Sequence, residues 1–156
     1  MKLSSQEEYG VRCLIAIARA GDEGFLTIPL IAKAEGLTES HVAKLLAILR
    51  RADFVKSTRG QSGGYALSRP ADKVYIKDVL DTLGGRLYDE SYCGRHAGVL
   101  EECVHSCQCR LDSLWRDIQA AVDSAIDGIT LEDLVTCVPV SKVELYSDGR
   151  PKAEAQ

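Results

Sequence analysis

Hydrophobic residues recur at the spacing of an α-helix in three successive stretches near the start of the chain. The first follows Ser4 with the serine–glutamate spacing of a capping box, and Gly21 ends it. The pattern predicts helices over residues 5–20 and 39–52, with a shorter one between them that is capped by Thr27. Their inward faces are predicted to be Val11, Leu14, Ile15 and Ala18, then Leu30, Ile31 and Ala34, then Val42, Leu45, Leu46 and Leu49.

A tight turn at residues 36–38 joins the second and third of these helices. Two helices joined by a short turn that contains glycine form the helix-turn-helix pattern. The second helix of such a unit enters the major groove of DNA. Its outward residues here carry groups that hydrogen-bond to base edges or to phosphates. They are Ser40, His41 and Lys44.

Two short runs with β-strand composition, residues 54–57 and 65–68, predict a hairpin after the third helix. The glycine-rich connection lacks the Gly-Lys-Ser/Thr of a phosphate-binding loop. A hairpin in this position is the wing of a winged helix, whose arginine can lie along a narrow minor groove. A plain hairpin with an exposed arginine is the alternative. We expect DNA contacts from Arg59, Gly60, Gly63, Gly64 and Tyr65.

The rest of the chain predicts a short helix over residues 76–83, a long helix over 111–125 and a last short helix capped by Thr130. A hydrophobic stripe on a long helix has to be covered, either within the chain or by a second copy. A two-fold dimer would present two copies of the helix over residues 39–52, the reading helix, to a palindromic site, with half-sites about 34 Å apart. The stripe consists of Leu111, Leu114, Trp115, Ile118, Ala121, Val122 and Ala125.

These elements predict a mainly α fold with a small β wing, a winged helix-turn-helix plus a long dimerisation helix. We expect a DNA-binding domain over residues 1–85, a cysteine-rich loop over 86–110, the dimerisation helix and a short C-terminal helix over 111–135, and a flexible tail over 136–156. No run approaches the roughly 18 apolar residues of a membrane span. The polar start lacks the pattern of a secretion signal, so we expect a cytoplasmic protein.

The charge of the chain is unevenly distributed. The formal net charge is −4, which by itself does not favour nucleic acid. Residues 38–73, however, hold seven Lys or Arg against three Asp or Glu. A basic module inside an acidic chain is consistent with a surface that faces DNA, although a solvated basic face is about as common.

Four of the six cysteines lie between residues 93 and 109, at Cys93, Cys103, Cys107 and Cys109. Thiolates bind zinc, copper(I) and iron–sulfur clusters. The loop has no C-x2-C, and its second pair, Cys107-x-Cys109, is too tight for the knuckles of a zinc site. A cluster can take ligands spread over a longer loop. We expect an iron–sulfur site, with a thiol redox switch or zinc as alternatives. Cys13 is predicted to be a buried hydrophobe. No catalytic constellation is present, so we do not expect an enzyme.

Four segments together resemble the winged-helix repressors that include IscR and NsrR. They are the start at Met1, the helix over 39–52, RGQSGGY at 59–65 and CRLDSLW at 109–115. The resemblance covers about residues 1–135 and implies a homodimeric transcription regulator, usually a repressor. It also implies a 2Fe–2S or 4Fe–4S cluster that senses nitric oxide, redox stress or iron–sulfur status and controls affinity for a palindromic operator in double-stranded DNA.

The resemblance further implies the cluster ligands. The three cysteines of the family correspond to Cys93, Cys103 and Cys109, and a carboxylate on the first helix corresponds to Glu8 of the partner subunit. The first gap is longer than is common in the family, and Cys107 is an extra cysteine and a rival fourth ligand. His105 is another local rival. Some members of the same family lack a cluster, so a thiol/disulfide regulator of the same fold is the alternative function.

Where some members have a histidine ligand three residues after the last cysteine, this chain has Asp112. At the position of that histidine, in the first turn of the long helix, this chain therefore carries a carboxylate rather than an imidazole. Cys137 receives no predicted role.

Overall fold

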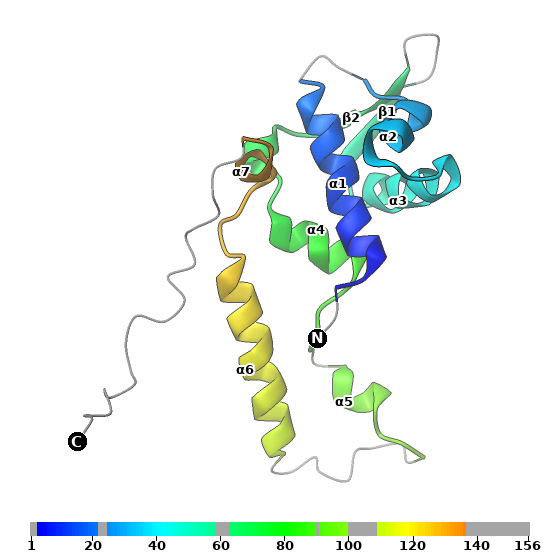
Figure 1. The fold of residues 1–156 in the computed structure, drawn as a ribbon. Coiled ribbons are helices and arrows are strands. Elements are labelled where there is room, and N and C mark those ends of the chain that lie inside the picture. Colours follow the sequence, from blue (N-terminus) through cyan, green and yellow to red (C-terminus); the bar gives the residue numbers. More distant parts are fainter. Residues whose placement is uncertain (1–2, 22–24, 59–62, 90, 100–108, 137–156) are drawn as a thin grey trace, which may run out of the picture.

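The structure is a computed structural model that describes residues 3–21, 25–58, 63–89, 91–99 and 109–136 (Figure 1). It confirms the predicted mainly α fold with one two-stranded antiparallel sheet. The elements are α1 (Ser5–Arg19), α2 (Ile28–Glu35), α3 (Glu39–Arg51), β1 (Val55–Thr58), β2 (Gly64–Leu67), the 3-10 helix η1 (Ala71–Lys73), α4 (Ile76–Leu83), α5 (Tyr92–Arg95), α6 (Arg110–Ala125) and α7 (Leu131–Val135). None of the described helices has the length and apolar character needed to cross a membrane.

Helix α1 begins at the predicted capping box. The side chain of Ser4 accepts a hydrogen bond from the backbone N–H of Glu7, and the backbone N–H of Ser4 donates to Glu7 Oε2 at 2.7 Å. Two of the N–H groups that a helix start leaves unpaired are satisfied in this way. The helix ends before Gly21, whose φ of +80° is a left-handed conformation that glycine adopts without strain.

The buried face of α1 differs from the predicted one. Cys13, Leu14 and Ile17 are fully or almost fully buried, whereas Val11 and Ile15 are only half-buried. The physical reason is that α1 contacts α2, α3, α4, α7 and β2, so several neighbours select its buried residues rather than one. The burial of Cys13 is confirmed.

The buried residues of the next two helices also follow their neighbours. On α2 the buried residues are Ile31 and Ala32, while Leu30 and Ala34 are exposed, contrary to the predicted face. Helix α2 has only two turns and contacts both α1 and α3. The spacing of its hydrophobic residues therefore does not determine which of them the two neighbours bury. On α3 all four predicted residues are buried: Val42, Leu45, Leu46 and Leu49.

Helix α4 packs directly against α1 at Gly10. A Cβ added to Gly10 would meet the end of the Leu83 side chain, which would have to shift to make room. The glycine therefore lets this leucine pack directly on the backbone of α1. The contact fixes α4, and through it the following segment, relative to the helix-turn-helix.

A backbone motif at the end of α3 sets the start of the wing. The N–H of Phe54 donates to the carbonyl of Leu49 at 2.9 Å, and Asp53 between them has a φ of +59°. This bonding closes the helix and buries Phe54 in the core. Strand β1 therefore begins at Val55 and pairs with β2 from Val55↔Leu67 to Thr58↔Gly64. Both strands are displaced by one residue from the predicted runs.

A third segment joins the base of the wing. Leu26 and Tyr65 exchange backbone hydrogen bonds of 2.9 and 2.8 Å, which adds a short antiparallel bridge beside the hairpin. A Cβ on Gly64 would lie 2.7 Å from the carbonyl oxygen of Leu26. The packing of the wing against this segment therefore needs a glycine at position 64.

The last helix, α7, returns to the first. Its Leu131 is completely buried in the same core as α1, and its N–H donates to the carbonyl of Val74 at 2.8 Å. Thr130 and Asp133 form a capping box that starts the helix, as the position of Thr130 predicts. Leu131 consequently belongs to the core of the helix-turn-helix body, and Ile129, Leu134 and Val135 pack against that core, although all four follow α6 in the chain (Figure 1).

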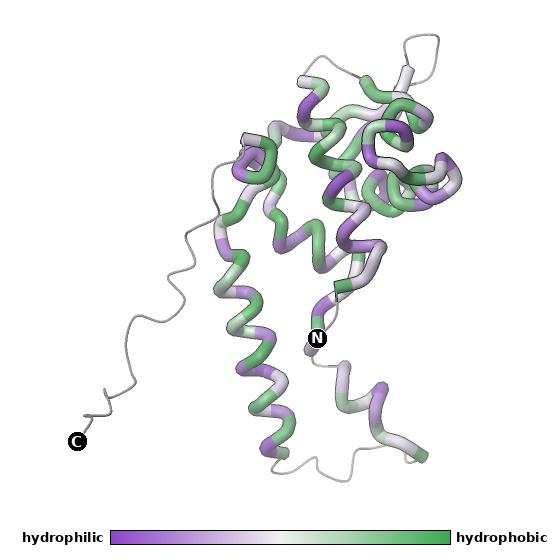
Figure 2. Tube along the Cα trace, in the orientation of Figure 1, coloured by the Kyte–Doolittle hydropathy of each residue, from purple (hydrophilic) through white to green (hydrophobic). Residues whose placement is uncertain are grey.

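Helix α6 extends away from this body, and hydrophobic positions recur along it (Figures 1 and 2). Leu111, Leu114 and Trp115 are 54%, 47% and 37% exposed, so much of the predicted stripe is uncovered within the described chain. The one buried residue of α6 is the polar Gln119. The helix therefore has a polar side that faces its own chain and an apolar side that faces outward.

We expect Leu131→Ala to lower the free energy of unfolding by about 2–5 kcal/mol, because it leaves a cavity in the shared core. The control Glu132→Ala removes an exposed side chain of the same helix and should change stability by less than about 0.5 kcal/mol. Urea denaturation of both variants measures the difference. Equal stabilities would contradict the placement of α7 in the core.

Candidate DNA interface and cysteine site

The outward face of α3 begins at its cap. The hydroxyl of Thr38 accepts a hydrogen bond from the N–H of His41 at 3.3 Å and lies 3.3 Å from the hydroxyl of Ser40. Ser40 and Lys44 are exposed, and His41 is half-buried. The four hydrophobic residues on the opposite side hold the helix, so these three side chains are presented together. Their contact with DNA stays a prediction.

The ring of His41 is held by a chain of contacts from α1 and α2. Tyr9 meets His41 edge to face, with ring centroids 5.4 Å apart and planes at 78°. The guanidinium of Arg12 lies 5.5 Å from the centroid of the Tyr9 ring and pairs with the carboxylate of Glu35 at 2.9 Å. Such aromatic and cation–π contacts are directional, so they restrict the orientation of His41.

Sequence reasoning did not identify Tyr9, Arg12 or Glu35 as part of this interface. Tyr9 lies at the edge of the apolar stripe of α1, where a partly buried aromatic residue needs no special explanation. The available signal was an aromatic residue beside the charged Arg12 on the outer edge of a core helix. Only the packing of α1 against α3 and α2 shows that Tyr9 contacts His41 and that Arg12 pairs with Glu35.

The structure describes part of the predicted wing interface. Gly63, Gly64 and Tyr65 are half-buried at the start of β2, whereas Arg59 and Gly60 lie outside the described residues. Gly64 has a packing role against Leu26, and Tyr65 packs against the core. Any contact of these residues with DNA stays a prediction.

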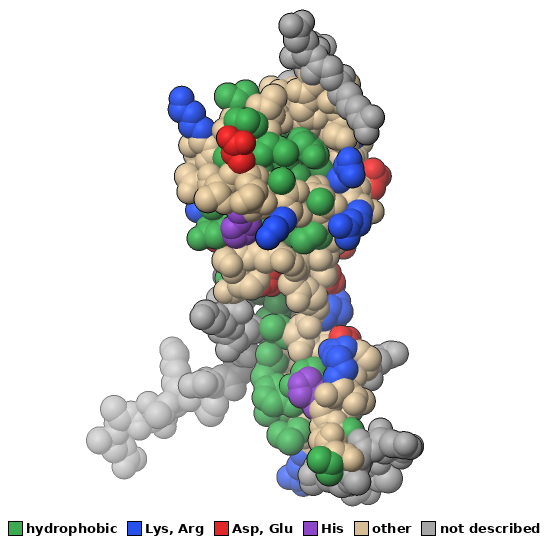
Figure 3. Space-filling model, turned by 90° about the vertical axis from the view of Figure 1, so that its right-hand side faces the viewer, with side chains coloured by type: hydrophobic (Ala, Val, Ile, Leu, Met, Phe, Trp, Pro, Cys, Tyr) green, Lys and Arg blue, Asp and Glu red, His purple; other side chains and the backbone are tan. Residues whose placement is uncertain are grey.

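Basic and imidazole side chains gather on the face where α2 and α3 lie (Figure 3). Lys44, Arg50 and Arg51 of α3 and Lys56 of β1 are exposed, and Arg50 donates to the hydroxyl of Ser57 at 3.4 Å. Within the described residues, no carboxylate forms an ion pair with any of these four cations. Such a surface can attract the phosphate backbone of DNA without regard to sequence.

The two described cysteines of the predicted cluster site stand at the ends of one segment. Cys93 lies in α5, Cys109 is the N-cap of α6, and both are half-buried free thiols. Cys103, His105 and Cys107 lie outside the described residues. No group of three or more His, Cys, Asp or Glu side chains in the described part is arranged to hold a metal ion. The described residues thus present two of the three expected thiolates.

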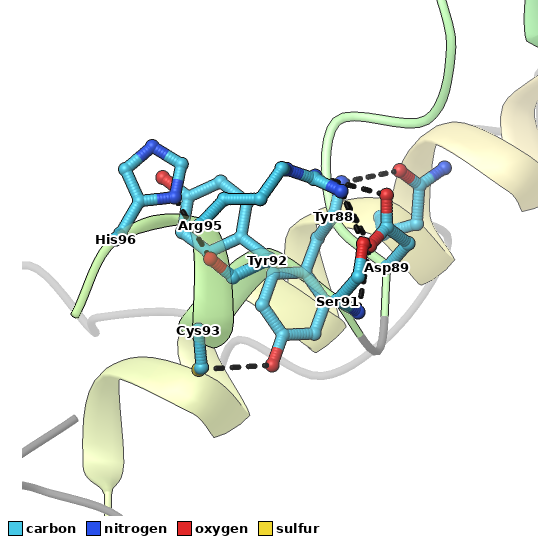
Figure 4. Close-up of polar contacts among 8 residues, drawn as sticks. Tyr88, Asp89, Ser91, Tyr92, Cys93, Arg95 and His96 are labelled. Carbon is cyan, nitrogen blue, oxygen red and sulfur yellow. Dashed lines mark hydrogen bonds and ion pairs between the residues drawn. The ribbon is translucent and has the colours of Figure 1, made fainter. Parts of the chain in front are cut away.

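Tyr88 connects Cys93 to helix α6 (Figure 4). Its hydroxyl lies 3.9 Å from Cys93 Sγ and donates a hydrogen bond to Oδ1 of Asp112, while Arg116 donates to the other oxygen of Asp112 at 2.6 Å. The bond from Tyr88, followed by that from Arg116, lowers the pKa of the Asp112 carboxyl. The same bond to Asp112 raises the pKa of the Tyr88 hydroxyl. Both effects favour a protonated tyrosine facing an ionised aspartate.

A second set of polar contacts attaches α6 to the rest of the chain. The side chain of Gln119 accepts from the backbone N–H of Tyr88 at 3.1 Å and donates to Asp123 at 2.9 Å. Asp123 pairs with Arg86 at 2.5 Å and with Lys77 of α4 at 3.6 Å. The polar side of α6 is therefore joined both to the segment before α5 and to α4.

Helix α5 is a single turn stabilised by its own side chains. Asp89 accepts from Arg95 at 3.0 Å and from the backbone N–H of Ser91 at 2.8 Å, and these bonds, chiefly that from Arg95, lower the pKa of Asp89 to about 2 (Figure 4). His96 stacks on Tyr92 with ring centroids 4.1 Å apart, and its Nδ1 lies 2.8 Å from the carbonyl oxygen of Tyr92. Cys93 is thus carried by a small, cross-linked unit.

The predicted fourth ligand, Glu8, lies exposed in the first turn of α1. Its neighbour Glu7 is occupied by the capping box with Ser4, so the two glutamates differ in availability. The backbone N–H of Glu8 donates to the carbonyl of Ser4. Among the described residues, no side-chain hydrogen bond or ion pair occupies its carboxylate, which is exposed and so accessible to a second chain. Its service as a ligand stays a prediction.

The donor set is chemically suited to an iron–sulfur cluster. Two free thiols flank the undescribed segment, which contains two more cysteines in the sequence. Thiolates are the usual ligands of such clusters, and a free thiol pair is also what a reversible disulfide requires. The residues present therefore fit both of the functions expected from the sequence.

The fold and the reading helix define this protein as a winged-helix, DNA-binding transcriptional regulator. The family described as "Rrf2: Iron-dependent Transcriptional regulator" matches residues 3–137. The chain belongs to the Rrf2 family.

Relatives of similar sequence are named as transcriptional regulators rather than enzymes. The chain is 31% identical over 143 residues to the HTH-type transcriptional regulator IscR of Aliivibrio salmonicida, covering 92% of this chain and 82% of that one. It is 30% identical over 135 residues to IscR of Xenorhabdus nematophila, covering 86% and 79%.

Solved structures of similar fold include proteins named IscR and proteins named CymR. The IscR of T. potens is 26% identical with a TM-score of 0.68, covering 95% of this chain and 94% of that one. CymR, the global cysteine regulator of B. subtilis, is 29% identical with a TM-score of 0.67, covering 88% and 98%. The oxidised form of Staphylococcus aureus CymR is 28% identical with a TM-score of 0.67 and the same coverage.

We expect Lys44→Ala to weaken DNA binding and to lower the magnitude of the salt slope by about one, because a lost phosphate contact releases one fewer counterion. Lys73→Ala is the matched control, since Lys73 is exposed on η1 and pairs with Asp72. Fluorescence anisotropy at several salt concentrations measures both quantities. Identical slopes for wild type and Lys44→Ala would exclude a phosphate contact by Lys44.

Proposed function

We propose that this protein is a homodimeric repressor whose affinity for a palindromic operator is controlled at the cysteine site by an iron–sulfur cluster. The signal would be nitric oxide, redox stress or iron–sulfur status. The observation that carries the proposal is the contact of Tyr88 with both Cys93 and Asp112, which links a cysteine of the site to helix α6. The relatives named IscR support the same assignment.

The ligands of the proposed cluster are Cys93, Cys103 and Cys109, with Glu8 of the partner subunit as the fourth and Cys107 as its rival. The accessible carboxylate of Glu8 and the two described free thiols support this set. When bound, an iron–sulfur cluster supplies a redox-active centre whose potential depends on its ligands, hydrogen bonds and exposure. The hydroxyl of Tyr88 lies 3.9 Å from Cys93 Sγ. Its single proton is donated to Asp112, so Tyr88 would contact the proposed ligand without donating a hydrogen bond to it.

The chain's own contacts provide a route from the cysteine site to the reading helix. Shared ligation would hold α5 and the start of α6 together, and Tyr88 already joins both. Gln119 and Asp123 then attach α6 to Arg86 and to Lys77 of α4. Because α4 packs on α1 at Gly10, a change in the position of α5 relative to α6 would alter how the winged helix is held.

The energy needed for such control is modest. A coupling free energy of about 1–3 kcal/mol changes affinity about 5- to 150-fold. Release of the ligands would let the segment between Cys93 and Cys109 lose order, which is one of the standard switching transitions. The resulting change in the spacing of the two reading helices would then alter their simultaneous fit to the operator.

Dimerisation would involve the outward side of α6. Leu111, Leu114 and Trp115 are exposed there, and a helix with a continuous apolar stripe is stabilised by covering it. A second copy is the occupant that gives two reading helices and a two-fold axis, which matches a palindromic operator. The polar side of α6, which carries Gln119, remains with its own chain.

We expect Leu114→Asp to convert the dimer into a monomer, because a dimer interface would bury an unpaired charge. Ser124→Asp is the control, since Ser124 is exposed on the same helix outside the apolar stripe. Light scattering coupled to size-exclusion chromatography measures both masses. A dimer that survives Leu114→Asp would contradict this interface.

We expect anaerobically purified protein to be brown. Cys93→Ala should reduce bound iron and sulfide by at least about tenfold. Loss of a residue that only supports a ligand already lowers metal affinity about tenfold or more, and loss of a ligand should lower it at least as much. Cys13→Ala is the control, because Cys13 is buried in the core and burial raises the pKa of its thiol to about 11. Visible absorption with iron and sulfide analysis provides the readout. A colourless protein with stoichiometric zinc would refute the cluster.

The second candidate is a cluster-free thiol regulator of the same fold. The similarity to the oxidised form of Staphylococcus aureus CymR favours it, as do the free thiols at Cys93 and Cys109. In that case the protein is colourless and diamide changes its mobility on a non-reducing gel. Cys13→Ala would leave that change intact, whereas loss of the participating cysteine would abolish it.

A further inference from the structure

Asp112 lies in the first turn of α6, three residues after Cys109, and the proposed ligand set gives it no role. Both of its carboxylate oxygens already have partners within the chain. Oδ1 accepts a hydrogen bond from the hydroxyl of Tyr88, and Oδ2 accepts one from Arg116 at 2.6 Å. A metal ion that used Asp112 as a ligand would have to compete with the tyrosine proton or with the guanidinium.

Tyr88, the residue that donates to Asp112, is attached to α6 at both of its ends. Its backbone N–H donates to Oε1 of Gln119 at 3.1 Å, and its hydroxyl donates to Asp112. Gln119 and Asp112 are separated by about two helical turns, so they lie on one side of α6. Only 8% of Tyr88 is exposed. The tyrosine therefore lies along α6 and has little freedom to move.

The same tyrosine contacts α5, the helix that carries Cys93 (Figure 4). Its ring is tilted against that of Tyr92, with centroids 5.2 Å apart, and its hydroxyl oxygen lies 3.9 Å from Cys93 Sγ. Because the phenol donates its one proton to Asp112, the thiol is the group left to donate in this contact. Cys93 is thus held, through Tyr88, against the turn of α6 that begins at Cys109.

A carboxylate in the first turn of a helix also has a purely local explanation, because it interacts favourably with the positive end of the helix dipole. That explanation accounts for the charge of Asp112 but not for its bond to a buried tyrosine. The two contributions can be separated experimentally, since asparagine keeps an acceptor oxygen and lacks the charge.

We propose that Asp112 is a positioning residue rather than a ligand, and that it acts through Tyr88 to hold Cys93 beside the start of α6. The carboxylate orients the phenol, and the phenol restricts the thiol before any ligand binds. Preorganisation of this kind lowers the ordering cost of binding. The inference deepens the proposed function and rests on it for the effect on iron, whereas the positioning itself is a property of the metal-free chain.

The first test is hydrogen exchange in the metal-free full chain. The probes are the backbone amides of Tyr88, Arg95 and His96, which donate to Gln119, Ser91 and Cys93 respectively. Tyr88→Phe and Asp112→Ala should each speed exchange at these amides at least about threefold. The reason is that hydrogen bonds to charged groups are among the stronger ones, and their loss favours local opening.

The controls remove similar groups that do not join α5 to α6. Tyr92→Phe removes the hydroxyl of the neighbouring ring, and Asp117→Ala removes an exposed carboxylate of α6. Both should leave the three amides unchanged. The double variant Tyr88→Phe/Asp112→Ala should exchange no faster than the faster single variant, because the two residues act through one bond.

Asp112→Asn distinguishes the acceptor oxygen from the charge. Its Oδ1 can still accept from the hydroxyl of Tyr88, so exchange should stay close to that of wild type. If the carboxylate acted only on the helix dipole, Asp112→Asn would instead resemble Asp112→Ala, and that result would overturn the proposal.

The second test is iron retention by the reconstituted protein against a chelator, with visible and electron paramagnetic resonance spectra. Tyr88→Phe and Asp112→Ala should weaken retention alike, by about tenfold, as expected for residues that support a ligand. The spectra of the loaded variants should keep the shape of the wild-type spectra. A ligand role predicts the opposite pattern, in which Asp112→Ala changes the spectra and Tyr88→Phe does not.

The two tests separate this inference from the proposed function. Unchanged exchange in both Tyr88→Phe and Asp112→Ala would overturn the positioning role, whether or not the protein holds a cluster. Altered spectra in Asp112→Ala alone would also overturn it. Absence of iron from the wild type would refute the proposed cluster, and the exchange result would still decide whether Asp112 positions Cys93.

Discussion

The burial of helix α1 is the constraint on which the rest of this structure depends. Its Leu14 and Ile17 are almost completely inaccessible, and α2, α3, α4 and α7 all pack around it. Because protein interiors are packed like crystals, a displacement of any of these helices is felt at the others. The reading helix α3 and the helix α4 that follows the wing are therefore parts of one core. Helix α4 meets α1 at the contact of Leu83 with Gly10.

Helix α1 also carries, at adjacent positions, a residue of the proposed cluster site and a residue that contacts the reading helix. Glu8, the proposed ligand for the partner's cluster, is adjacent to Tyr9, whose ring contacts His41 on the reading helix. A change at the start of α1 is thus one residue away from the contact that orients His41, which is proposed to reach DNA. This arrangement gives a physical reason why a ligand on α1 would influence DNA binding more directly than a fourth cysteine in the loop.

Helix α6 has to satisfy two different requirements on its two sides. The polar side is fixed by Gln119, Asp112 and Asp123 through contacts with Tyr88 and the arginines. The apolar side is exposed at Leu111, Leu114 and Trp115 and is the side that we propose a second copy covers. Polar contacts of this kind specify an orientation more than they add stability. The position of α6 relative to the body is therefore defined, but little free energy is needed to change it. Such a balance suits an element that transmits a signal.

The sequence by itself determined the helix-turn-helix, the hairpin, the capping boxes at Ser4 and Thr130, the burial of Cys13 and the family, because caps, turns and periodic apolar residues are local signals. Only the tertiary structure decided the buried faces of α1 and α2, the need for glycine at position 64 and the return of α7 to the core. It also decided the contacts of Tyr9 with His41 and of Tyr88 with Asp112. These depend on how elements distant in the chain cross, and the spacing of residues within one element does not encode that crossing.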